Sequence, residues 1–321
     1  MLTKPKSFCA PLTSIFLTGI ICLIGIPICY ADNQSLSSFF SDDTHIQVVN
    51  QELDKIEAQS QNKSTRPAFS IVSKKNEYSF SREIYWSKFD EPKNFYQRGF
   101  MSGYNAEFTH RFTSNPKLLI NMFRFQGQWA NGKFKQPAYE GFSGIKDSTY
   151  EVRGVAGKDF YPASFLRATP YLGFGYRYLK DNAQGLSAAV DGYDVFGYKG
   201  YSHYFYLPIG ADILFQTNSR YSLESNLEYD HLIDGYQVDK LGIFPGFNNI
   251  SMEQGKGNGL KGSLRFNLYF KDYTAFVEGF YRYWNIGPSK AKSVVSGEPS
   301  IYENEPKNNT EEFGLRVGLQ V

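Results

Sequence analysis

The last eleven residues, 311–321, read EEFGLRVGLQV and alternate in polarity. The odd positions from Phe313 to Leu319 are apolar, whereas the even positions carry Glu312, Arg316 and Gln320. Side chains with a period of two point to opposite faces of a β-strand. This segment therefore predicts a strand with one apolar face and one polar face.

The same period recurs along the chain from about Glu77. We expect about ten strands, although eight or twelve would also fit the pattern. The nine that precede the terminal strand lie in residues 77–86, 99–112, 117–129, 149–157, 170–179, 204–215, 221–230, 264–270 and 275–284. The first is the weakest, because Arg82 falls on its apolar face.

The connections between these segments alternate in length. Short ones fall at residues 113–116, 159–164, 217–220 and 271–273, and longer ones at 87–98, 131–147, 180–200, 233–258 and 285–311. Antiparallel neighbours joined by tight turns at one rim and long loops at the other form an up-and-down barrel. Both termini then lie on the short-turn rim, which we expect to face the periplasm.

A soluble β-sandwich or periplasmic barrel also alternates, so the alternation alone does not decide between water and membrane. Three features favour a transmembrane barrel: charges lie opposite the apolar face, the strands approach the 9 to 11 residues that cross a tilted bilayer, and aromatic residues gather at strand ends. The aromatic residues expected in interfacial girdles are Tyr85, Trp86, Trp129, Tyr176, Tyr178, Tyr283 and Trp284.

Residues 1–31 have the pattern of a secretory signal peptide. Lys4 and Lys6 precede an apolar run, and small residues lead to cleavage after Ala31. The alternative, an N-terminal membrane anchor, would need a longer apolar run. Residues 32–70 form a polar leader, in which Ile46, Val49, Leu53 and Ile56 have the spacing of a short amphipathic helix. Residues 71–321 would form the barrel.

The cysteines argue against several kinds of chemistry. All three, Cys9, Cys22 and Cys29, lie within the signal peptide. The mature chain then has no disulfide, no cysteine nucleophile and no thiolate metal site. A net charge of +2 gives no reason to expect nucleic acid as a partner. We expect no metal and no cofactor.

Residues 77–321 resemble the small, monomeric, OmpA-like or opacity-like porins of Gram-negative outer membranes. The resemblance rests on the signal peptide, the alternation and the terminal strand FGLRVGLQV. It implies that the barrel assembly machinery reads this strand, and that the protein contacts outer-membrane lipid and lipopolysaccharide. The chain departs from the usual pattern in ending at Val321 instead of Phe or Trp.

In a barrel of about ten strands the lumen is hardly wider than its side chains. Acidic and basic residues on the inward faces are roughly matched, which predicts a network of ion pairs that plugs the lumen. An ion-selective constriction is the alternative. The expected members are Glu107, Arg111, Arg124, Glu151, Arg153, Arg177, Asp212, Glu224, Glu228, Arg265, Glu278, Arg282 and Arg316.

Few residues suggest catalysis. His110 precedes a Ser-Asn pair, faintly as in outer-membrane lipid hydrolases, but the alternation directs it toward lipid. Glu228, Asp230 and His231 are similar to the acidic residues and histidine of ten-stranded outer-membrane proteases, yet the adjacent residues Asp230 and His231 point to opposite faces. We therefore expect no enzymatic activity, with a barrel-embedded protease or lipid-modifying enzyme as an alternative.

Two prolines, Pro170 and Pro208, lie inside expected strands, where each removes a ladder hydrogen bond. A symmetric hairpin places Pro170 opposite about Gly210 and Pro208 opposite about Leu172. This predicts a weak seam between the two strands, and such gaps admit lipid in barrel palmitoyltransferases.

The long loops are rich in glycine and aromatic residues, and binding residues commonly lie on loops held by a rigid scaffold. We therefore expect a structural or surface-interaction role such as adhesion, with an extracellular ligand that the sequence does not name. A small-solute, porin-like channel is the alternative.

Overall fold

The computed structural model describes residues 71, 73–92, 96–112, 118–137, 142–190, 193–295 and 301–321. The expected signal peptide and the leader helix fall outside these residues. Among the described residues, no helix is long and apolar enough to cross a membrane.

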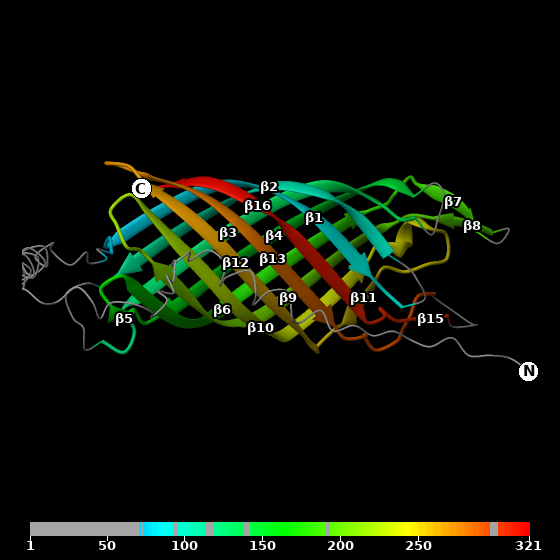
Figure 1. Cartoon of the computed structure of the whole chain (residues 1–321). Helices are drawn as coiled ribbons and strands as arrows, with labels where there is room; N and C mark the ends of the chain where they lie inside the picture. Colours follow the sequence, from blue (N-terminus) through cyan, green and yellow to red (C-terminus); the bar gives the residue numbers. More distant parts are fainter. Residues whose placement is uncertain are drawn as a thin grey trace, which may run out of the picture. The chain divides into compact units, whose positions relative to one another are not determined.

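The described chain forms a closed antiparallel barrel of ten long strands (Figure 1). The prediction of about ten strands is confirmed. The barrel closes where the last strand pairs with the first, from Ser79 opposite Gln320 to Asp90 opposite Asn309. The strands of the wall are β1 (Asn76–Asp90), β2 (Tyr96–Arg111), β3 (Met122–Lys135), β4 (Ser143–Gly157), β6 (Leu166–Asn182), β9 (Lys199–Phe215), β10 (Tyr221–Asp239), β12 (Gly257–Tyr269), β13 (Thr274–Ile286) and β16 (Asn308–Gln320).

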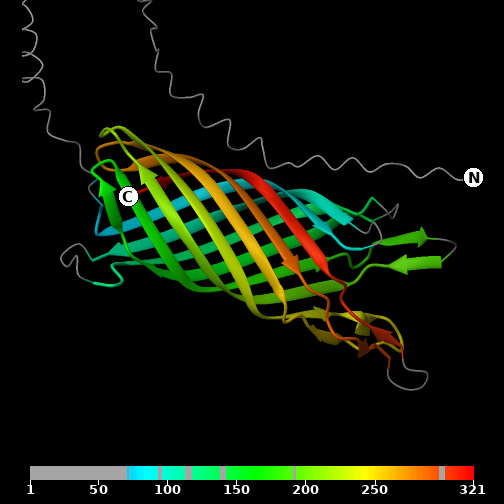
Figure 2. The same ribbon diagram turned by 60° about the horizontal axis from the view of Figure 1, so that its bottom comes forward.

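Shorter elements lie at the two ends of the barrel. One end holds β5 and the C-terminus, and the opposite end holds β7, β8, β11 and β15 (Figures 1 and 2). We call these the short-turn rim and the long-loop rim. The short elements are β5 (Phe160–Ala163), β7 (Ser187–Val190), β8 (Tyr193–Phe196), the 3₁₀ turn η3 (Leu241–Ile243), β11 (Ile250–Glu253), β14 (Lys292–Ser293) and β15 (Tyr302–Glu303).

The strands are longer than expected, at 13 to 19 residues. The predicted loops 131–147 and 233–258 were therefore too wide, since β3 runs to Lys135, β4 begins at Ser143 and β10 runs to Asp239. The alternation continues there but its sense reverses. Phe134 and Ile145 face inward and are buried, whereas Lys133 and Lys146 face outward. A search for strands whose apolar residues face outward misses strand ends whose apolar residues face inward.

On the short-turn side of these residues, the outward faces of the strands form an apolar belt of exposed Leu, Ile, Val, Phe and Tyr side chains. The expected girdle is wrong at Tyr85 and Trp284, which are 1% and 2% exposed because they share the inward parity of Glu83 and Arg282. Arg82 does face outward, lying over the ring of Tyr104.

The seam between β6 and β9 is interrupted near the prolines. Pro170 lies opposite Ala211, one residue from the expected partner. The ladder pairs Leu172 with Ile209 and resumes only at Gly175 and Tyr206. Pro208 lies within this gap, where its missing N–H removes one donor. The defects do fall in one part of one seam.

We predict faster amide exchange at this gap. The N–H group of Gly173, which faces β9, should exchange several-fold faster than those of Leu264 and Phe266, because unpaired backbone groups are less protected. Hydrogen–deuterium exchange on the protein in lipid nanodiscs measures this. The β12–β13 ladder, continuous from Gly257 to Tyr269, is the internal control. Equal exchange rates would contradict a weak seam.

Candidate functional site

The inward-facing charges of the barrel form several groups of ion pairs. Every residue expected in the network has an ion-pair partner among the described residues except Glu224. Glu224 is half-buried and lines the same central cavity as Arg265 and Asp212. Buried charges cost several kcal/mol each when unpaired, so the pairing is what makes the polar interior tolerable.

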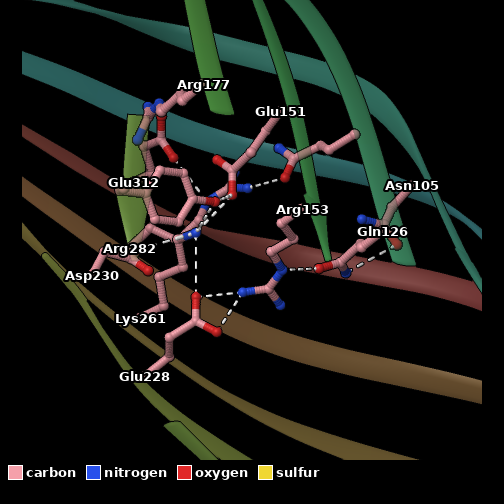
Figure 3. Close-up of polar contacts among 12 residues, drawn as sticks. Asn105, Gln126, Glu151, Arg153, Arg177, Glu228, Asp230, Lys261, Arg282 and Glu312 are labelled. Atoms are coloured by element: carbon pink, nitrogen blue, oxygen red, sulfur yellow. Dashed lines mark hydrogen bonds and ion pairs between the residues drawn. The ribbon is translucent and has the colours of Figure 1, made fainter. Parts of the chain in front are cut away.

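Lys261 occupies the centre of the first group (Figure 3). Its Nζ lies 2.6 Å from Glu151 Oε1, 3.4 Å from Glu228 Oε1 and 3.2 Å from Asp230 Oδ2. Arg153 also pairs with Glu228. One ammonium therefore holds three carboxylates contributed by two strands, β4 and β10.

A second group links the barrel's closing seam. Arg316 Nη2 lies 2.9 Å from Glu83 Oε2, and its Nη1 lies 2.6 Å from Glu278 Oε1. Glu278 Oε2 also pairs with Arg265 Nε at 2.6 Å. These contacts join β16 to both of its neighbours, β1 and β13, on the inner side of the wall.

A third group lies nearer the long-loop rim. Glu312 accepts Arg177 Nη2 at 2.7 Å and pairs with Arg282 Nε at 2.8 Å. The guanidinium of Arg177 also lies 5.3 Å from the ring centre of Trp284. Toward the short-turn rim, Arg124 pairs with Asp212 at 2.7 Å, and Arg111 pairs with Asp159 at 3.0 Å.

The sequence reasoning missed several members of this network. Lys261 shares the parity of Arg265 in its strand, and Glu83 shares that of Tyr85, so the alternation contained the signal. Asp159 lies in a connection instead of a wall strand, and no periodicity pointed to it.

Side chains fill most of the barrel's centre. The cavity between Arg124, Lys261 and Arg282 measures only about 80 Å³. A cavity of about 280 Å³ lies toward the short-turn rim, and a larger one of about 550 Å³ lies at the long-loop rim. The ion pairs at the level of Lys261 separate the two.

The histidine and acidic residues considered for catalysis do not converge. Asp230 is fully buried in the lumen, whereas His231 is exposed on the outer face of the same strand. His110 bonds to Asn76 on the outer surface. Within the described ranges, no group of three or more His, Cys, Asp or Glu side chains has the arrangement of a metal site.

The cavity at the long-loop rim, here called the vestibule, has one apolar side. Phe134, Phe142 and Met101 form it together with Ala183 and Val195, which come from the loop that carries β7 and β8. Its volume is in the range of small-molecule sites.

The other side of the vestibule is acidic. Its lining includes the carboxyl groups of Glu91, Asp147, Asp181, Asp239, Glu303 and Glu305. These groups lie beyond the apolar belt, where β4, β6 and β10 extend past the membrane level. The carboxyl group of Glu305 accepts a hydrogen bond from Gln237 Nε2 at 2.9 Å.

Burial sets the ionisation of these groups. It raises the pKa of Glu91 to about 7, with Asp239 and Asp181 adding to the shift. It also raises the pKa of Asp181 to about 6, and that of Asp239 to about 6 with the help of Glu303. The pKa of Glu305 is raised well above its usual value by burial and by Glu91. The vestibule therefore gains negative charge between about pH 6 and 7.

The raised pKa values have a consequence for stability. A carboxyl whose folded pKa exceeds its unfolded value contributes fully below about pH 4, and this contribution is lost as the pH rises through the folded pKa. At neutral pH the vestibule thus holds carboxylates in mutual repulsion. A bound cation would relieve that repulsion.

The floor of the vestibule contains unsatisfied donors. Arg177 lines it and is 2% exposed, yet its Nε and Nη1 have no hydrogen-bond partner in the described part of the chain. Buried polar groups are normally paired, so the free donors of Arg177 mark an incomplete site.

Solved structures similar to this chain are bacterial outer-membrane proteins. The outer membrane protease OmpT from Escherichia coli superposes with a TM-score of 0.52 and 10% identity, over 79% of this chain and 98% of that one. The fold is an outer-membrane β-barrel. At this identity the likeness shows the fold alone.

Two further structures are more distant. The translocator domain of the autotransporter NalP from Neisseria meningitidis has a TM-score of 0.40 and 11% identity, over 88% of this chain and 99% of that one. The attachment invasion locus protein Ail of Yersinia pestis has a TM-score of 0.27 and 13% identity, over 77% and 100%. No family model matches the sequence. No curated protein matches it either.

We predict that Lys261→Met destabilises the barrel by about 3–5 kcal/mol, because three buried carboxylates lose their cation. Urea titration of the refolded protein in lipid vesicles, followed by tryptophan fluorescence, measures this.

The matched control is Lys256→Met, which removes an exposed lysine at the long-loop rim. It should change the free energy of unfolding by no more than about 0.5 kcal/mol. Equal effects of the two substitutions would show that Lys261 does not neutralise the lumen.

Proposed function

We propose that this protein is a non-enzymatic surface-interaction protein of the outer membrane, whose vestibule binds a cationic ligand with an apolar portion. The observation that carries this proposal is the acidic and aromatic cavity of about 550 Å³ above a lumen filled by ion pairs. The long-loop rim faces the outside, so that the vestibule meets extracellular molecules.

The fold supports this orientation. Short turns lie on the periplasmic side of outer-membrane barrels and longer loops on the extracellular side. In the proposal the chain is a monomer, delivered after cleavage at Ala31 and inserted by the barrel assembly machinery through its terminal strand.

The loops around the vestibule are packed together, which favours a preformed site. Leu241, Ile250 and Met252 form a small core with Val294, which belongs to the connection between β13 and β16. Phe247, in the connection between β10 and β12, forms an isolated β-bridge with Val295, in the connection between β13 and β16. A preformed site loses less conformational entropy on binding than a flexible one.

The chemistry of the lining selects the ligand class. Carboxylates without a basic partner among the described residues attract amines, amidines or guanidinium groups, and the side formed by Phe134, Phe142 and Met101 takes an apolar body. The unpartnered N–H groups of Arg177 at the floor would donate hydrogen bonds to a carbonyl or carboxylate oxygen of the same ligand. A basic peptide segment or an aromatic polyamine has these features.

We predict that pentamidine, an aromatic diamidine, binds the protein more tightly at pH 8 than at pH 5. Its charge is constant over this range, whereas the pKa of Asp239 is about 6 and that of Glu91 about 7, so the site ionises between the two conditions. Isothermal titration calorimetry in detergent measures the affinity.

Asp239→Asn should weaken this binding, and Glu253→Gln serves as its control. Glu253 is an exposed acid of β11 that does not line the vestibule. An affinity that is independent of pH, or equal losses in both variants, would rule out the vestibule as a cation site.

We also expect no stepwise conductance in planar bilayers, because the ion pairs around Lys261 leave only about 80 Å³ at the barrel's centre. A general porin inserted in the same bilayer provides the positive control. Regular single-channel steps from the purified protein would favour the small-solute channel instead.

A further inference from the structure

Beyond the apolar belt, the outer wall of β2, β3 and β4 carries a band of cations. Arg98, Lys133, Lys135 and Lys146 all face outward and are exposed. The strand register places Arg98 directly opposite Lys135, and Lys133 directly opposite Lys146. Lys88 of β1 lies opposite Arg98 and is paired with Asp90.

This arrangement is unfavourable by itself. Like charges directly opposite one another in an antiparallel pair are destabilising. None of the described residues forms an ion pair with Arg98, Lys133, Lys135 or Lys146. An anion placed between the two strands would remove the repulsion.

An apolar groove lies on the same strands, at the level of the belt. It measures about 670 Å³ and is floored by Ala106, Gly127 and Gly154, with Phe125 and Phe174 at its sides. The floor is low because these residues have small side chains or none. A Cβ built at Gly127 would meet no atom within 4 Å.

The groove and the cation band are separated by a suitable distance. Gly127 and Lys133 lie six residues apart on β3, which is about 20 Å along the strand. A fatty acyl chain extended along the strand has a length on this scale. Its headgroup would then lie at the cation band.

On the opposite side of the barrel the cations do not face one another across strands. There, the outward positions at the strand ends are Asn258 on β12, Asn285 on β13 and Asn309 on β16, and the exposed Lys256 and Lys307 lie just beyond the first and the last of these strands. No two outward-facing basic residues lie opposite one another in the described ladders of β12, β13 and β16. The facing cation pairs therefore lie on the side of the barrel that carries the groove.

We propose that this face binds one phosphorylated, acylated lipid of the surrounding leaflet, with an acyl chain in the groove and phosphate oxygens between the cation pairs. The site is separate from the vestibule and does not depend on the ligand proposed there. Phosphate suits the cation band because Lys and Arg donate charge-assisted hydrogen bonds to its oxygens.

The test is native mass spectrometry of the purified protein in detergent, titrated with bisphosphorylated lipid A and, separately, with lipid A lacking both phosphates. The phosphorylated lipid should bind about tenfold or more tightly than the other. The double variant Lys133→Gln/Lys146→Gln should lose that difference. Gly127→Phe should weaken binding of both lipids by filling the groove.

Two variants on other parts of the barrel serve as controls. Lys256→Gln/Lys290→Gln removes the same charge from exposed positions at the long-loop rim. Gly262→Phe adds the same ring to the wall at β12, where a Cβ has only an ordinary contact with Asn226 O at 3.8 Å. Both should bind like the unmodified protein, and heat-modifiable gel migration verifies that each variant folds.

Equal binding of the two lipids would overturn the proposal, as would a loss of binding in the controls equal to that in the test variants. In a further titration, inorganic phosphate is added as a competitor of the phosphorylated lipid. If it displaces the phosphorylated lipid at millimolar concentration, the band is a site for free anions and the lipid assignment is wrong.

Discussion

The structure depends on the rule that no backbone N–H or C=O can remain unpaired in hydrocarbon. A sheet meets this rule only by closing on itself, and here closure is the pairing of β1 with β16 from Ser79 to Asp90. Closure then divides the side chains of every strand into an outward set that meets lipid and an inward set that does not. The remaining features follow from this division.

The inward set has to be polar without being wet. Ten strands enclose a narrow space, so the charges that avoid lipid are pressed together and must neutralise one another. Lys261, with three carboxylates within 3.4 Å, shows how one cation can compensate charges from different strands. Arg316 does the same across the closing seam, and thereby connects the first strand to the last two.

Beyond the apolar belt, toward the long-loop rim, the polar face of β3 and β4 is the outer one and the apolar face is the inner one. Water now lies outside, so Lys133 and Lys146 point outward while Phe134 and Ile145 are buried inside. The same wall therefore creates two distinct surfaces at the long-loop rim: an enclosed apolar and acidic vestibule, and an external band of cations. Both arise because the strands continue well past the hydrocarbon.

The sequence by itself predicted about ten wall strands, their antiparallel order and the side of each strand that Glu151, Arg177 or Phe313 occupies, because a period of two is a local property of the chain. It did not determine where the strands end, since the alternation of residues 131–147 reverses its sense at the membrane boundary. Tyr85 and Trp284 were misplaced although their parity was readable, because their aromatic character suggested an interface.

Only the tertiary structure decided which charges meet and which cavities remain. Lys261 and Glu151 are 110 residues apart, and no local pattern relates them. The acids of the vestibule come from β4, β6, β10 and the connections after β1 and β13, which meet only when the barrel closes. The sequence reports the face on which a residue lies, but the register and the curvature of the closed sheet decide its neighbours.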